Sequence, residues 1–160
     1  MSSPIRNFFR LDDTLSTGAQ PTAEDLAWLA ERGFTAVLNV NTATARNYLP
    51  DEHSLLAARG VRYVHHPIDC AVLTPEKYEG FRAALDGLLG EGPVFVHCAG
   101  NVKVTGMMYL YRILRRGEPR EQVSADLARL PELEPKWYAY FERMGAPASK
   151  AIAAGPAPGA

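Results

Sequence analysis

The chain has 160 residues and a formal net charge of -1, with 47% hydrophobic and 22% charged residues. Such values are typical of a single soluble domain with one core, and they give no sign of a nucleic-acid or anionic-membrane partner. Two cysteines are too few for a disulfide framework, and with no secretory signal or long apolar run we expect a cytoplasmic protein that is not in the membrane.

The first half of the chain predicts two helices and two strands. Thr22 fits an N-cap followed by acidic residues, and the helix that it opens should end near Gly33. The uncharged apolar run 34–40 predicts a buried strand. A short helix over 52–58 and a strand over 61–68 should follow.

The second half continues this alternation. Thr74, a capping hydroxyl followed by proline, predicts the start of a helix that precedes a strand over 94–96. The helix over 105–115 is apolar almost all round, Leu114 included, so it should be central and buried. Two further helices should have a proline in their first turn, Pro119 and Pro135. The pattern predicts an α/β fold with a mainly parallel sheet of about four or five strands flanked by helices.

The chain should form one domain over residues 1–144. From residue 145 to residue 160 it consists mainly of alanine, glycine and proline, a composition that cannot build a core. We therefore expect a flexible tail over 145–160.

Residues 92–114 carry the strongest chemical signal. An apolar strand ends at His97, Cys98 stands where the chain leaves the sheet, and a buried helix follows a short loop. A helix N-terminus at this edge attracts anions and favours the thiolate form of a nearby cysteine. Gly100 and Asn101 tolerate the tight backbone in which consecutive N–H groups converge. The segment predicts an anion-binding loop with a reactive thiol.

The same segment resembles the signature of the protein tyrosine and dual-specificity phosphatases. More widely, residues 5–143 are similar to a bacterial dual-specificity-phosphatase-like group. The similarity rests on GAQPT at 18–22, VLNV at 37–40, PDE at 50–52, PID at 67–69 and HCAGNVKVT at 97–105.

This resemblance implies nucleophilic displacement at phosphorus without a metal or organic cofactor. Cys98 would attack a phosphorylated substrate, an aspartic acid would protonate the leaving oxygen, and water would hydrolyse the cysteinyl-phosphate. Asp69 occupies a place comparable to that of the family's general acid, with Asp51 and Glu76 as alternatives. Thr105 occupies the family's hydroxyl position, and His97 would support the loop. Phosphate, or an inorganic sulfate, would be bound by Ala99, Gly100, Asn101, Val102, Lys103 and Val104.

One position departs from the family pattern. Val104 stands where the family has an arginine, and Lys103, one residue earlier, is the only cation of the loop. An arginine fork binds two phosphate oxygens at once, whereas a lysine offers a point charge, and one lost donor commonly costs roughly 100- to 1,000-fold in rate. Weak phosphatase activity and a phosphate-binding pseudophosphatase are therefore both open.

The early cation also matches the loop length of rhodanese-like sulfurtransferases, which would carry a persulfide on Cys98. Lys103 itself is either an anion ligand or a solvated surface charge. Cys70, next to Asp69, is either an ordinary buried thiol or a partner that protects Cys98 in a reversible disulfide.

Overall fold

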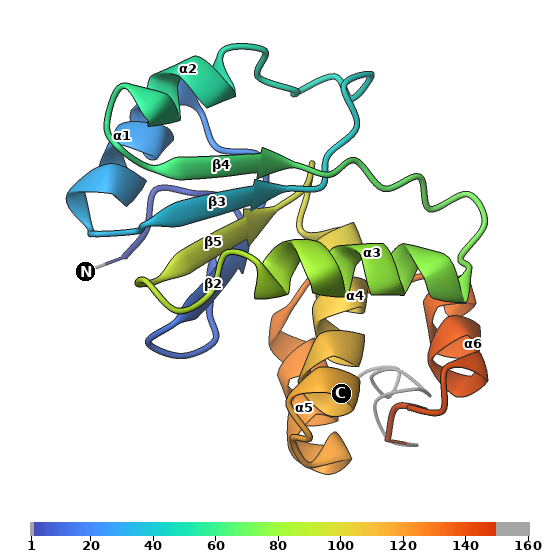
Figure 1. Ribbon diagram of the computed structural model, residues 1–160. Helices are drawn as coiled ribbons and strands as arrows, with labels where there is room; N and C mark the ends of the chain where they lie inside the picture. Colours follow the sequence, from blue (N-terminus) through green and yellow to red (C-terminus); the bar gives the residue numbers. More distant parts are fainter. Residues whose placement is uncertain (1, 150–160) are drawn as a thin grey trace, which may run out of the picture.

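The computed structural model describes residues 2–149 as a central sheet with helices on both faces (Figure 1). The strands follow one another in space in the order β1-β2-β5-β3-β4. Only the β1–β2 pair is antiparallel. Their bounds are Phe9–Arg10 (β1), Leu15–Gly18 (β2), Ala36–Asn39 (β3), Arg62–His65 (β4) and Val94–His97 (β5). The predicted α/β fold with a mainly parallel sheet is confirmed.

Helices α1 (Ala23–Glu31) and α2 (Glu52–Ala57) cover one face of the sheet, and the remaining helices lie on the other side (Figure 1). These are α3 (Pro75–Asp86), α4 (Val102–Leu110), the π-helical turn η1 (Tyr111–Arg115), α5 (Arg120–Asp126), the 3₁₀ turn η2 (Leu127–Arg129) and α6 (Pro135–Arg143). Alternate residues of a strand point to opposite faces, and β5 follows this rule. Val94 and Val96 enter the larger core cluster under α3 and α4, and Phe95 enters the smaller one under α1 and α2.

The register of the parallel strands brings their carboxyl ends to one edge of the sheet. His97 lies opposite Gly18 on one side and opposite Asn39 on the other, and Asn39 lies opposite His65. In open α/β sheets this edge is where ligands bind. The segments that follow these strand ends therefore come together around Cys98.

The local signals agree with the structure at most helix starts. Thr22 forms a full capping box with Asp25, and Gly33 adopts a positive φ of 87° after α1. The prediction that the Thr74 hydroxyl caps α3 is wrong, since its side chain makes no capping hydrogen bond, although Pro75 does stand in the first turn.

The central helix differs from the prediction at both ends. It begins at Val102, three residues earlier than the predicted start at 105. Asn101, the N-cap residue, takes a left-handed conformation, and the helix begins directly after it. Its end widens into a π-helical turn, and Leu114 there is 42% exposed, so the expected burial of Leu114 is wrong.

The predicted tail falls partly outside the described residues, which end at 149. Residues 150–160 lie beyond them, and their flexibility stays a prediction. Within 145–149, Ala146 is buried and the Ser149 amide donates to Ser124 Oγ at 3.0 Å, so this part packs against α5. None of the helices in residues 2–149 is both long enough and apolar enough to cross a lipid bilayer.

Candidate active site

The anion loop, which we define as residues 98–104, joins the end of β5 to the first turn of α4. Its carbonyl oxygens accept hydrogen bonds from groups that surround the loop. Cys98 O accepts from His97 Nδ1 at 3.2 Å, and Asn101 O accepts from the Thr105 hydroxyl and amide. Ala99 O accepts hydrogen bonds from the backbone N–H of Gln20 at 3.1 Å, from Asn47 Nδ2 at 2.9 Å and from the Arg6 guanidinium at 3.3 Å. Gly100 O accepts one from Asn7 Nδ2 at 3.0 Å.

With the carbonyl groups engaged in this way, the amide groups of the loop are left available. Within the described residues, no backbone acceptor bonds the amides of Ala99, Gly100 or Asn101. The first amides of α4 have no intrahelical acceptor by the geometry of a helix start. Successive unpaired N–H groups at a helix N-terminus form a concave site for an oxyanion.

Asn101 gives the loop its shape. Its φ of 67° lies in the left-handed region, which asparagine tolerates, and its side chain is fully buried. Asn101 Nδ2 donates to the carbonyl oxygen of Asn7 at 2.9 Å and to Thr17 Oγ1 at 3.1 Å. The loop is thereby anchored to the amino-terminal segment and to β2.

His97, the residue before Cys98, forms a buried pair with Glu52. His97 Nε2 lies 2.5 Å from Glu52 Oε2, with the two side chains 0% and 1% exposed. Gln20 and Asn39 donate to the other oxygen of Glu52 at 2.8 and 3.4 Å. This network supports the position of His97, and through it the carbonyl of Cys98.

Cys98, which follows β5 and opens the loop, is 2% exposed and belongs to the larger core cluster. Val104, at the family's arginine position, is 0% exposed and belongs to the larger core cluster. Its side chain is therefore a core residue, and only its backbone can take part in anion binding. Thr105 is buried too, and its hydroxyl donates to Asn101 O.

The Lys103 ammonium group is turned toward neighbouring strand ends. It donates to the carbonyl oxygen of Val40 at 3.3 Å and to that of Ile68. Lys103 thus ties the first turn of α4 to the segment that carries Asp69.

Asp69 is exposed and follows Ile68 at the same edge of the sheet. The Ala71 amide donates to its Oδ1 at 2.9 Å. This hydrogen bond, against slight desolvation and with help from three nearby lysines, lowers the pKa of Asp69 below its usual value. The structure brings Asp69 and Cys98 to the same edge of the sheet, whereas Asp51 and Glu76 form no hydrogen bond or ion pair with the loop within residues 2–149.

Cys70 lies beside this site. Burial raises the pKa of its thiol, against the pull of the neighbouring lysines, and Cys98 acts on it electrostatically as well. Both cysteines are free thiols.

Several residues that hold the loop were not predicted from the sequence: Arg6, Asn7, Thr17, Gln20, Asn47 and Glu52. Gln20 and Glu52 stand inside the GAQPT and PDE segments, so those motifs held a signal for them. Asn7, with a φ of 56°, has no such motif.

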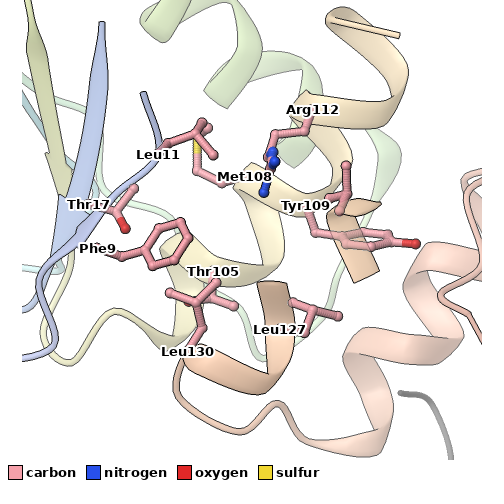
Figure 2. A pocket seen from close by; sticks show the side chains of 10 residues that line it. Phe9, Leu11, Thr17, Thr105, Met108, Tyr109, Arg112, Leu127 and Leu130 are labelled. Atoms are coloured by element: carbon pink, nitrogen blue, oxygen red, sulfur yellow. The ribbon is translucent and has the colours of Figure 1, made fainter. Parts of the chain in front are cut away.

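A separate apolar pocket lies behind the loop, between β1, α4 and η2 (Figure 2). Thr17 and Thr105 belong to its wall and also hold Asn101, so the pocket backs onto the loop without opening to Cys98. The residues 2–149 contain no group of three or more histidine, cysteine or acidic side chains that could hold a metal ion.

Comparison with solved structures places this architecture among phosphatases. A putative phosphatase from Shewanella putrefaciens is 28% identical, with a TM-score of 0.74 over 89% of this chain and 90% of its own. TpbA from P. aeruginosa, solved with phosphotyrosine, is 22% identical, with a TM-score of 0.65 over 82% and 75% of the two chains. The catalytic domain of SIW14 from S. cerevisiae, a PP-IP phosphatase solved with citrate, is 15% identical, with a TM-score of 0.62 over 94% and 84%.

The likenesses to TpbA and SIW14 show the fold alone. A search of curated protein sequences finds no significant match. The model of the family described as "DSP-PTPase phosphatase fused to NAD+ Kinase" matches residues 10–135. Because that match spans most of the chain, the protein belongs to this family of dual-specificity-type phosphatase domains.

Proposed function

We propose that the protein hydrolyses phosphomonoesters through a cysteinyl-phosphate on Cys98. The observation that carries the proposal is the anion loop, whose carbonyl groups accept hydrogen bonds from surrounding residues, while the amides of Ala99, Gly100 and Asn101, which directly follow Cys98, bond no backbone acceptor within the described residues. Such a loop binds the equatorial oxygens of a phosphoryl group and stabilises the charge that they carry in the transition state.

The reaction needs two displacements at phosphorus. Cys98 Sγ forms a bond to phosphorus as the bond to the ester oxygen breaks, and the protonated Asp69 carboxyl gives its proton to that oxygen. A water molecule then attacks the same phosphorus and loses a proton to the Asp69 carboxylate. The sulfur–phosphorus bond breaks, which releases phosphate and restores the Cys98 thiolate.

Thr105 acts as a positioning residue in this proposal. Its hydroxyl donates to Asn101 O and so helps to keep that carbonyl away from the anion. His97 has a similar role through its hydrogen bond to Cys98 O.

The proposed enzyme is slow. Val104 offers no side-chain donor, and the Lys103 ammonium is engaged with two carbonyl oxygens. Backbone amides and the charge of Lys103 would therefore bind the phosphoryl group without an arginine fork. Loss of one such donor costs roughly 100- to 1,000-fold in rate, which leaves measurable turnover.

Turnover of p-nitrophenyl phosphate tests the proposal. Wild type should release p-nitrophenol, and Cys98→Ser should reduce the rate to that of buffer. Cys70→Ser is the matched control, because it removes the other thiol of the site, and its turnover should continue. Equal rates for wild type and Cys98→Ser would exclude the cysteinyl-phosphate route. Thiosulfate-to-cyanide transfer by the same proteins tests the sulfurtransferase alternative.

A further inference from the structure

All lysines in the described residues converge on one short segment. The chain has four lysines, and three of them, Lys77, Lys103 and Lys136, lie within residues 2–149. Each donates to backbone carbonyl groups of the segment 68–72, which we call the acid segment because it carries Asp69. Lys77 Nζ bonds Asp69 O at 2.6 Å and Val72 O at 2.5 Å, Lys136 Nζ bonds Cys70 O at 2.7 Å, and Lys103 Nζ bonds Ile68 O.

The charge of these three lysines, which we call the lysine group, exceeds that of the Asp69 carboxylate with which all three interact. The arginines differ from the lysines in this respect, because several of them form ion pairs with carboxylates within residues 2–149. Arg112, for example, pairs with both Glu118 and Asp126. None of the three lysines forms an ion pair within residues 2–149. Three ammonium groups against the single Asp69 carboxylate leave an excess of positive charge at the acid segment.

The lysine group adjoins the anion loop. Lys103 belongs to that loop, and all three lysines lower the pKa of Asp69. The Cys70 thiol, in the same segment, interacts electrostatically with Cys98 and with the same three lysines. The positive charges therefore lie next to the place where the substrate's reacting phosphate would bind.

Holding the acid segment needs hydrogen-bond donors but not positive charge. Neutral groups hold carbonyl oxygens nearby, as the Tyr140 hydroxyl does with Thr74 O at 2.6 Å and the Asn47 amide does with Ala99 O. An ammonium group has three N–H bonds. Lys136 uses one of them and is exposed, and Lys77 uses two, so each keeps a donor for a ligand.

We propose that Lys77 and Lys136, beside Lys103, form a subsite for a second anionic group of the substrate. The substrate class that this subsite fits is a small molecule with at least two phosphate groups, one in the anion loop and another over the acid segment. The inference rests on the proposed function, since it names the substrate class of the same site.

Anion binding by a protein that cannot turn over tests the subsite. Inorganic tripolyphosphate and inorganic phosphate would be titrated into Cys98→Ser by isothermal calorimetry in 0.1 M salt. We expect tripolyphosphate to bind at least about tenfold more tightly. Exposed charge pairs are worth up to about 1 kcal/mol each, so Lys136→Met should reduce that preference by roughly threefold, and adding Lys77→Met should reduce it further.

Matched variants separate charge from shape. Lys136→Arg keeps the charge and should keep the preference. Arg59→Met removes one exposed cation at the turn before β4, the opposite edge of the sheet, and should leave the preference unchanged. Equal affinities for the two anions, or an equal loss in Arg59→Met and Lys136→Met, would overturn the subsite.

The two proposals fail in different ways. Absence of p-nitrophenyl phosphate turnover by wild type counts against the phosphatase mechanism alone, because the titration needs no catalysis. Turnover without a tripolyphosphate preference counts against the subsite alone.

Discussion

Asn101 sets the geometry of the anion loop through both its backbone and its side chain. Its left-handed φ turns the chain from β5 into α4, and asparagine visits this region more readily than other residues that have a Cβ. Its Nδ2 group also bonds Asn7 O and Thr17 Oγ1. One residue thus connects the loop to two segments that are distant in the sequence.

Substitution of Asn101 separates these two contributions. Asn101→Ala should lower the free energy of unfolding by about 2–3 kcal/mol, because it strains the left-handed backbone and removes the donor of Asn7 O and of the buried Thr17 Oγ1. Asn101→Gly removes only the hydrogen bonds and should cost about 1 kcal/mol less than the alanine variant. Urea denaturation measures both. Equal losses would mean that the backbone conformation contributes nothing.

Asp69 makes the proposed chemistry dependent on pH. A general acid must be protonated, and the hydrogen bond from Ala71 together with the lysine charges holds the pKa of Asp69 below its ordinary value. The protonated fraction therefore falls by about tenfold per pH unit above that value, and kcat/KM should fall with it from acid toward neutral pH. Phenyl phosphate is the suitable substrate, because its leaving oxygen needs a proton.

The variant Asp69→Asn checks this assignment. This variant should react slowly at acid pH, and its kcat/KM should not fall with rising pH as that of wild type does. The kcat/KM values of the two proteins should therefore converge toward neutral pH. A decline of the same size in Asp69→Asn would assign the acid role to another group.

At the scale of elements, α2 is held against the site by a single buried carboxylate. Glu52 opens this helix and bonds His97 at the end of β5 as well as Gln20, which precedes α1. Asn39 at the end of β3 also donates to Glu52, so four segments of the chain meet at this side chain.

Removal of that carboxylate should be costly. Glu52→Ala leaves the buried His97 and the half-buried Gln20 without this partner, and breaking a buried pair typically costs about 3–5 kcal/mol. Glu52→Gln keeps an acceptor for Gln20 and places a side-chain amide near His97, so we expect a smaller loss. Thermal unfolding followed by circular dichroism measures both variants. A larger loss in the glutamine variant would contradict this account.

The elements with complete local signals were predictable from the sequence. Helix α1 has a capping box and a glycine after its end, and β3 and β5 are short apolar runs bounded by turns. Strands β1 and β2 were missed. The sequence of β2, LSTG, lacks an apolar pattern, yet Ser16 and Thr17 are buried because β1 and β5 pair with the strand on both sides.

The same distinction applies to the site. Cys98, Asn101 and the helix start after them are adjacent in the sequence, so the loop could be predicted locally. Asn7 bonds Gly100 across 93 positions, and Glu52 bonds His97 across 45. Contacts at such separations depend on the packed sheet, and no short motif encodes them.

At the scale of the whole molecule, the position of the anion loop depends on how α4 packs. This helix is buried from Val104 through Leu110, and α6 lies against it on the side away from the sheet. Trp137 of α6 is 1% exposed and stacks over Gly106, in the first half of α4. The absence of a side chain at Gly106 lets the indole ring approach the helix backbone, and the aromatic group around Tyr109 and Phe141 packs beside it.

A methyl group at this position should therefore disturb the molecule as a whole. A Cβ at Gly106 would lie 2.2 Å from Trp137 Cε3, a ring atom that cannot move without displacing α6. We expect Gly106→Ala to lower the free energy of unfolding by about 2–3 kcal/mol in urea denaturation, despite the better helix propensity of alanine. Gly100→Ala is the control, because its Cβ would meet no atom within 4 Å and its stability should equal that of wild type. If Gly106→Ala matched wild type as well, α6 would have to be free to shift on α4, and the close approach of the indole ring would not stabilise the fold.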